Sequence, residues 1–318
     1  MAHDNHQKSL KDKVSDWIQT EGYPLEFSVA QTFHKYGFDA NQGQYVKDEE
    51  VNSLCEIDVL AQESEVEKDS LVRVCNVVEC KWSRDKPWVI FTSRNNRIAE
   101  SACIAQTISN KAGQAVLWAI AGDKKLWLTQ MFRSPLKAGF NGRQVFGQKN
   151  DLFYQALQSV TRKSRLLVNK YDPHRSTPEE LLRSVVIAFP LIVVDSDLFE
   201  AYLNPDVEKL VVEEADHLRM HWRGSPSWPL HATVDIVRKA KLDQFAEVRR
   251  KETDFLIENM LGCLARIQLF SKTGDLRTLK VKEGGRGIVG LPPLLWELRD
   301  RIKPKRPALT NKRRKKSN

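Results

Sequence analysis

Residues 71–82 read LVRVCNVVECKW, a run of β-branched and apolar residues with one glutamate and one lysine near its end. Such a run predicts a central strand that is covered on both faces of a sheet. Residues two apart on a strand share a face, so Glu79 and Lys81 point the same way and flank Cys80. Because acidic side chains rarely enter a sheet interior alone, Glu79 indicates a paired or metal-bound carboxylate.

The preceding strand candidate supplies a second carboxylate. Residues 54–62 read LCEIDVLAQ, in which Glu56 and Asp58 share a face. If the two strands are neighbours, Asp58, Glu79 and Lys81 converge on one spot. Two carboxylates, with water and phosphate oxygens, suit a magnesium ion, and a nearby lysine can stabilise developing negative charge. This combination indicates phosphodiester hydrolysis.

An amphipathic helix is expected upstream of these strands. Pro24 suits its first turn, Gly37 is a natural stop, and Glu26 lies in the first turn, where a helix N-terminus favours a carboxylate. Its apolar stripe has helical spacing and comprises Leu25, Val29, Phe33 and Tyr36. A shorter helix is expected over residues 9–20 and a strand over residues 42–46.

These residues resemble the PD-(D/E)xK, or restriction-endonuclease-like, nuclease superfamily. The pattern of that superfamily is a glutamate on an early helix, an aspartate on one strand and (D/E)-x-K on the next. Here Glu26 stands on the early helix, Asp58 in CEIDVL, and Glu79, Cys80 and Lys81 in VVECKW. The resemblance implies an α/β fold, a mixed sheet flanked by helices with an αβββαβ core.

The resemblance also implies roles. Asp58, Glu79 and the backbone carbonyl of Cys80 are expected to hold Mg²⁺, for which Mn²⁺ can substitute. Glu26 would assist directly or through water, and Lys81 would serve the attacking water or the transition state. The implied activity is DNA hydrolysis, with an endonuclease favoured over an exonuclease, and a homodimer is possible. A catalytically idle nucleic-acid-binding module, an RNA-cleaving nuclease and plain surface salt bridges at the strand ends are the alternatives.

The resemblance covers about Lys13 to Ala121, and the chain continues well beyond it. Within it, the core is expected to close with a helix over residues 98–112 and a strand over 115–121. Further expected elements are strands at 125–131, 185–194, 208–222 and 231–237, helices at 151–171 and 239–260, and a glycine-containing loop around Gly139, Gly142 and Gly147. We expect a nuclease-like domain over 1–150 and an additional α/β half over 151–298 that extends the first sheet or forms a second domain.

The net charge of +9 lies entirely in residues 299–318, which carry ten basic residues and one acidic residue. We expect this stretch to be a flexible tail that neutralises phosphates, or a solubilising or nuclear-import segment. Basic residues after the central strand are further candidates for phosphate contacts. The expected nucleic-acid-binding residues are Arg84, Lys86, Arg94, Arg97, Lys312, Arg313 and Arg314.

Composition excludes several classes of protein. A hydrophobic content of 41% and a charged content of 29% exclude collagen-like, disulfide-scaffold and wholly disordered chains. The longest apolar run, residues 185–194, is far shorter than the roughly 20 residues that span a bilayer, so no membrane partner is expected. The N-terminus lacks the apolar stretch of a secretory signal, and the five cysteines lack zinc-site spacing. We expect a cytoplasmic protein, nuclear if the source is a eukaryote.

Overall fold

The computed structural model describes residues 8–49, 51–82, 86–146, 152–173, 175–223, 231–279 and 290–302. Within these residues one mixed sheet of eleven strands has the order β1-β2-β3-β7-β11-β10-β6-β4-β8-β9, with β5 paired to β7. The strands are β1 (Asp39–Asp48), β2 (Ser53–Glu67), β3 (Ser70–Trp82), β4 (Trp88–Ser93), β5 (Ile108–Ser109), β6 (Ala138–Gln144), β7 (Ser184–Asp195), β8 (Leu198–Asn204), β9 (Lys209–Glu214), β10 (His217–Arg223) and β11 (His231–Arg238).

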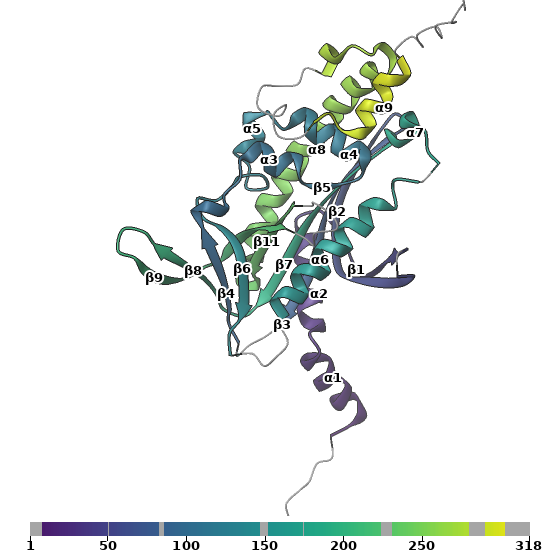
Figure 1. The fold of residues 1–318 in the computed structure, drawn as a ribbon. Coiled ribbons are helices and arrows are strands. Elements are labelled where there is room, and N and C mark those ends of the chain that lie inside the picture. The colour runs from purple at the N-terminus through teal and green to yellow at the C-terminus, as the bar shows by residue number, and fades with distance from the viewer. Residues whose placement is uncertain are drawn as a thin grey trace, which may run out of the picture.

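Helices cover both faces of this sheet (Figure 1). On one face α6 packs over Cys75 and Val77 of β3, and on the other α2 packs over Val78. The helices are α1 (Leu10–Thr20), α2 (Tyr23–Lys35), α3 (Glu100–Ala105), α4 (Lys111–Ile120), α5 (Lys124–Trp127), α6 (Leu152–Asn169), α7 (Pro178–Leu181), α8 (Leu242–Thr273) and α9 (Pro293–Ile302). Among the described helices, none combines the length and the apolar character needed to cross a membrane.

The central position predicted for β3 is confirmed. It pairs antiparallel with β2 and parallel with β7, and Val74, Cys75, Val77 and Val78 are fully buried. A strand with neighbours on both edges and helices on both faces has no solvent-facing side, which is why its sequence lacks polar alternation. The two helices and three strands predicted for the N-terminal part are also present, with shifted ends.

The secondary structure predicted for residues 98–121, the last helix and strand of the expected αβββαβ core, was wrong. The expected strand over residues 115–121 is helix α4, which begins at the side-chain cap of Asn110 and is buried along most of its length. A short apolar run does not distinguish a strand from a buried helix, and the surroundings decide the outcome. The expected helix over 98–112 is divided into α3, β5 and the start of α4, and the expected strand over 125–131 overlaps α5.

The strand that lies parallel to β3 is instead β7, which follows α6. Between β3 and α6 the described chain also contains β4, α3, β5, α4, α5 and β6, so the helix and strand nearest to the expected closing pair do not follow β3 directly. Residues 151–298 thus contribute strands to the first sheet, the first of the two arrangements considered for them. Helix α8 extends from Leu242 to Thr273, well beyond the expected end near residue 260.

Strands β4, β6 and β8 were not predicted. Gly139 and Gly142, expected in a loop, lie in β6. A Cβ atom on Gly142 would lie 2.7 Å from the ring of Phe153 and 2.8 Å from Ile90, so glycine permits α6 to approach the sheet closely here. The glycines therefore serve packing of a strand rather than a turn.

Candidate active site

The first feature of the site is the point where β2 and β3 separate. Their ladder runs from Glu67 opposite Ser70 to Val59 opposite Val78. Beyond it, β2 continues beside β1, and β3 continues beside β7. The next residues along the two strands are Asp58 and Glu79, so the strands bring both carboxyl groups to the start of the gap.

The carboxylate of Asp58 bonds to the backbone inside this gap. The N–H of Cys80 donates to Asp58 Oδ2 at 2.8 Å, in place of a backbone partner on β2. In an extended strand the N–H and C=O of one residue point to the same edge, so the Cys80 carbonyl faces the same gap. This is the carbonyl that the sequence resemblance names as a metal ligand.

A lysine from α6 joins the two carboxylates. Lys163 Nζ lies 2.7 Å from Glu79 Oε2 and 3.1 Å from Asp58 Oδ1. One helical turn earlier, Ser159 donates a hydrogen bond of 2.8 Å to the same Glu79 oxygen. On the strand itself, Lys81 Nζ lies 2.6 Å from Glu79 Oε1. Glu79 is therefore bonded on both oxygens, and its side chain is 6% exposed.

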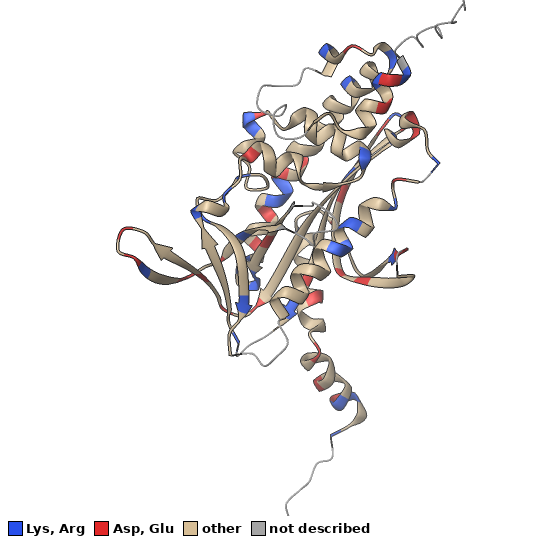
Figure 2. Cartoon of the chain, viewed as in Figure 1, with Lys and Arg blue, Asp and Glu red and all other residues tan. Residues whose placement is uncertain are grey.

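Neither Ser159 nor Lys163 was predicted as a site residue. Both lie in the helix expected over residues 151–171, and their spacing of four places them on one helix face. That spacing alone does not show which face meets the sheet. Figure 2 shows basic residues along α6 and acidic residues on the strands beside it. Only the packing of α6 over β2 and β3 identifies the two residues.

Glu26 completes the group from the opposite side of the sheet. It lies in the first turn of α2 and is half-buried. Burial, together with the charges of Asp58 and Glu56, raises its pKa to about 7, against the opposing effect of Lys163 and Lys81. The structure thus joins three of the four predicted catalytic residues, Asp58, Glu79 and Lys81, in one network of ion pairs through Lys163. Glu26 lies within electrostatic range of this network, as does Glu56.

The two central carboxyl groups have opposite pKa shifts. Burial, and then the charge of Glu79, raises the pKa of Asp58 above its ordinary value, although Lys163 and the Cys80 N–H oppose this. Burial acts in the same direction on Glu79, but Lys81 and Lys163 outweigh it and hold the pKa of Glu79 low. Of the two carboxyl groups, Glu79 is therefore the one that ionises more readily.

The charge balance bears on whether a cation fits. Asp58 lies within electrostatic reach of both Glu79 and Glu26, and Glu26 within reach of Glu56. Lys81 and Lys163 accompany these four carboxyl groups, so full ionisation of the six groups leaves two negative charges in excess. Hard oxygen donors in this number suit Mg²⁺. In the described part of the chain, however, no three His, Cys, Asp or Glu side chains are already arranged as a metal site. The donors fit a divalent cation only if Lys163 moves from between Asp58 and Glu79.

The three predicted nucleic-acid-binding residues that the structure describes, Lys86, Arg94 and Arg97, are not gathered at this gap. Arg94 and Arg97 follow β4, which is separated from β3 by β7, β11, β10 and β6. Arg97 forms an ion pair of 2.9 Å with Glu100. Lys86 precedes β4, and its backbone carbonyl accepts a hydrogen bond from Ser196. The remaining candidates, Arg84, Lys312, Arg313 and Arg314, lie outside the described residues.

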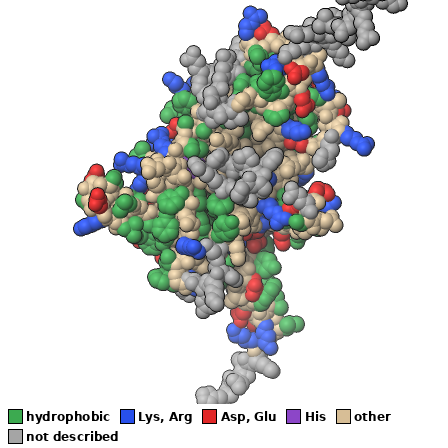
Figure 3. All heavy atoms as spheres, in the orientation of Figure 1, with side chains coloured by type: hydrophobic (Ala, Val, Ile, Leu, Met, Phe, Trp, Pro, Cys, Tyr) green, Lys and Arg blue, Asp and Glu red, His purple; other side chains and the backbone are tan. Residues whose placement is uncertain are grey.

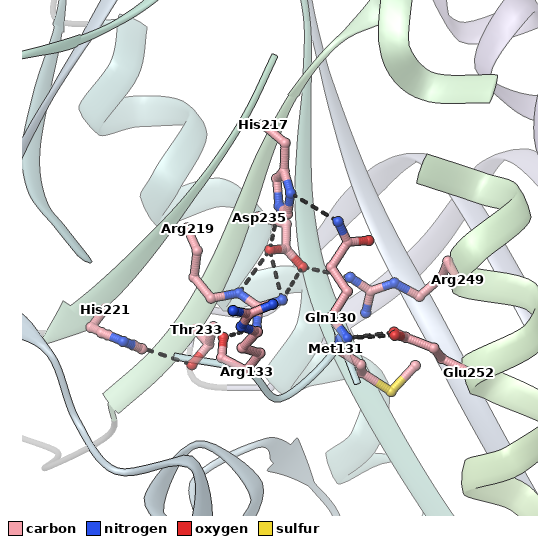
Figure 4. A network of polar contacts seen from close by, with 10 residues as sticks. All are labelled: Gln130, Met131, Arg133, His217, Arg219, His221, Thr233, Asp235, Arg249 and Glu252. Atoms are coloured by element: carbon pink, nitrogen blue, oxygen red, sulfur yellow. Dashed lines mark hydrogen bonds and ion pairs between the residues drawn. The ribbon is translucent and has the colours of Figure 1, made fainter. Parts of the chain in front are cut away.

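A second buried polar cluster surrounds Asp235 on β11 (Figure 4). Arg219 holds this carboxylate with two hydrogen bonds of 2.9 and 3.0 Å, and Arg249 of α8 donates a third at 2.6 Å. His217 Nε2 lies 2.9 Å from Asp235 Oδ1. The arginine and aspartate side chains are at most 4% exposed, so the cluster ties α8 to β10 and β11 inside the protein.

Comparisons of the chain with protein-family models, curated proteins and solved structures give no match. The resemblance to PD-(D/E)xK nucleases therefore rests on the residues described above. The class that the fold itself supports is a mixed α/β protein with one large sheet flanked by helices.

Proposed function

We propose that this protein is a metal-dependent nuclease that hydrolyses phosphodiester bonds in DNA, as an endonuclease rather than an exonuclease. The observation that carries the proposal is the meeting of Asp58, Glu79 and Lys81 where β2 and β3 separate. Glu26 is close enough to respond to the charges of Asp58 and Lys81. Carboxylates and a lysine in this arrangement match the requirements of phosphodiester hydrolysis.

Asp58, Glu79 and the Cys80 carbonyl are the groups that would hold Mg²⁺ or Mn²⁺. A bound divalent cation would lower the pKa of a water molecule and neutralise charge on a phosphate oxygen. Lys163 would exchange its bonds to the carboxylates for a contact with substrate phosphate, because a cation between Asp58 and Glu79 replaces its charge there. Lys81 keeps its ammonium beside Glu79, where it can orient the attacking water.

Glu26 has the property of a proton carrier at neutral pH. A carboxyl group with a pKa of about 7 is present in both protonation states near that pH. Groups of this kind serve best in acid–base steps near neutrality. We therefore assign Glu26 to proton exchange with water at the edge of the site, which agrees with the indirect role implied by the resemblance.

The proposal is tested by incubating the purified chain with supercoiled plasmid, linear duplex, single-stranded DNA and RNA, each with Mg²⁺, with Mn²⁺ and with a chelator. Nicking of closed circular plasmid would identify an endonuclease. Asp58→Asn and Lys81→Met should each abolish cleavage, since each removes one charge without a large change of shape. The exposed acidic residue Glu247, on α8, provides a matched control as Glu247→Gln. Cleavage that survives both site changes contradicts the proposal.

A second candidate function is a nucleic-acid-binding module whose carboxylates are structural. The observation that favours it is the ion pair of Lys163 with both Asp58 and Glu79, which makes the group stable without a cation. Such a module would bind DNA equally well in chelator and would show no thermal shift with Mg²⁺. An RNA-cleaving enzyme would be separated from both by the RNA arm of the cleavage assay.

A further inference from the structure

The hairpin of β8 and β9 forms one edge of the sheet and extends away from the body of the protein (Figure 1). Among the described residues, β9 pairs with β8 alone. The Ala215 N–H donates to the Leu198 carbonyl at 2.8 Å. Because bonding residues alternate along an antiparallel pair, Leu210, Val212 and Glu214 turn their N–H and C=O groups to the outer edge. This edge is therefore available for pairing with another strand.

One face of this hairpin is apolar and exposed. The register places Leu210 opposite Leu203 and Val212 opposite Ala201, so these side chains share a face. Leu203, Leu210 and Val212 are 63%, 67% and 56% exposed. The face continues onto β4, where Phe91 is aligned with Ala201.

Aromatic residues extend this face toward the body. The ring of Phe91 lies 6.5 Å from that of Phe140 on β6, and Phe140 is 51% exposed. Figure 3 shows hydrophobic side chains gathered beside the hairpin, over the region of β4, β6 and β8. A contiguous apolar face of this kind on an extended arm marks an interaction surface.

We propose that the partner is a second copy of the chain, joined by antiparallel pairing of β9 with β9. In the proposed register the two Val211 residues lie opposite each other on a two-fold axis. Leu210 of each copy then pairs with Val212 of the other copy through their outward N–H and C=O groups. In this register Lys209 lies opposite Glu213 of the second copy, and the same pair recurs across the axis. The sheet then continues through both copies, and the apolar faces of the two hairpins join.

Charge complementarity selects this register. Shifting the axis to Val212 would place Leu210 opposite Glu214 and Val211 opposite Glu213, with no ion pair. In the described part of the chain Lys209 has no ion-pair partner. Glu213 accepts a hydrogen bond from the Tyr202 hydroxyl through Oε1 at 3.2 Å, which leaves its other oxygen for a lysine. Opposite charges directly across an antiparallel pair are stabilising, and like charges there are destabilising.

Sedimentation equilibrium of the full chain tests the proposal, over about 1 to 200 μM because a short edge interface associates in that range. The wild type should dimerise. Lys209→Glu and Glu213→Lys should each weaken the dimer by at least about tenfold, since each creates two like-charge contacts. An equimolar mixture of these two variants should form a heterodimer of wild-type affinity, because the opposed charges are again complementary in both contacts.

Lys251→Glu, a charge reversal on the exposed face of α8, is the matched control and should leave the dimer unchanged. Circular dichroism would establish that each variant is folded. A wild type that stays monomeric over the whole range overturns the proposal, as does a dimer that responds equally to the control. Failure of the mixed variants to recover affinity would also overturn it. None of these outcomes depends on nuclease activity.

Discussion

Lys163 of α6 and Glu79 of β3 form an ion pair with a distance of 2.7 Å between Nζ and Oε2. The two residues are far apart in sequence, and the contact forms where β3 has lost β2 as its neighbour. Lys163 also bonds to Asp58, so one ammonium group occupies the space between the two carboxylates that are proposed as metal ligands. The relation between this lysine and a cation is therefore competitive.

Lys163→Met should make the stability of the folded protein depend more strongly on a bound cation. The change leaves Asp58 and Glu79 with fewer positive partners in a site that is largely buried, and we expect a loss of about 2 kcal/mol in the free energy of unfolding in chelator. Thermal unfolding with and without Mg²⁺ measures the effect. The Mg²⁺-induced rise in Tm should be larger than for the wild type, and an equal or smaller rise would contradict competition. Lys251→Met is the control, because that lysine is in an exposed ion pair.

Glu26 should make stability depend on pH between about 4.5 and 7. Its pKa rises from the ordinary 4.5 to about 7 on folding, so the folded protein binds a proton that the unfolded chain has released in this range. The contribution of Glu26 to the free energy of unfolding therefore falls as the pH rises. Above pH 7 Glu26 is ionised in the folded protein, and the full free-energy cost of holding this charge in a half-buried site is present. Glu26→Gln removes this cost.

Chemical unfolding of wild type and Glu26→Gln in chelator at pH 4 and pH 8 provides the measurement. The two proteins should be closest in stability at pH 4, and the variant should be the more stable at pH 8. The stability of Glu26→Gln minus that of the wild type should increase from pH 4 to pH 8. A decrease in this difference would contradict the prediction. Glu247→Gln, on the exposed face of α8, should show no such trend.

Asp235→Asn should destabilise the protein strongly. The change leaves Arg219 and Arg249 buried without their counter-charge, which costs about 3–5 kcal/mol. Burial alone would raise the pKa of Asp235, but the two arginines hold it well below its ordinary value. Its stabilising effect is thus present above pH 4 and is lost only as the pH falls further.

Urea unfolding at pH 5 and pH 8 should therefore give the same loss for Asp235→Asn at both values. Asp243→Asn is the control, since Asp243 is more than half exposed and pairs with Lys35 at the surface. Its loss should be much smaller than that of Asp235→Asn, because solvent screens an exposed ion pair. A loss of similar size in the two variants would show that the buried cluster is not a structural centre.

Gly142→Ala should destabilise the sheet by about 1–3 kcal/mol, because the new Cβ would lie within 2.8 Å of Phe153 and Ile90 in the core. Gly262→Ala, in the middle of α8, is the opposite case. The nearest atom to its new Cβ is the flexible end of Arg266 at 3.9 Å, so the helix should gain about 0.5–1 kcal/mol. Urea unfolding of both variants measures the two effects, and changes of the same sign would contradict this account of the glycines.

Sequence reasoning located the strands that carry the proposed catalytic residues. The β-branched run around Glu79 and the alternation around Asp58 predict strands with little ambiguity, and neighbouring strands then bring the two carboxylates together. Glu26 followed from the apolar stripe of α2. In each case the elements concerned lie close together along the chain.

The remaining features depend on contacts between distant segments. The run over residues 115–121 is apolar on every side, so only its enclosure by α8 and β7 makes it a helix. Lys163 looked like any other basic residue on an amphipathic helix, because its role requires α6 to lie over the gap between β2 and β3. Arg219 and Asp235 carry no motif, and their pairing arises from the register of β10 with β11.

The most direct test of the central claim measures plasmid nicking at pH 8 by the wild type and by Asp58→Asn, across a titration of Mg²⁺ from zero. The account predicts that the wild type nicks DNA only when the cation is present and that Asp58→Asn is inactive at every concentration. Nicking in chelator, or equal activity in the two proteins at saturating Mg²⁺, would contradict the claim that Asp58 and Glu79 hold a catalytic cation.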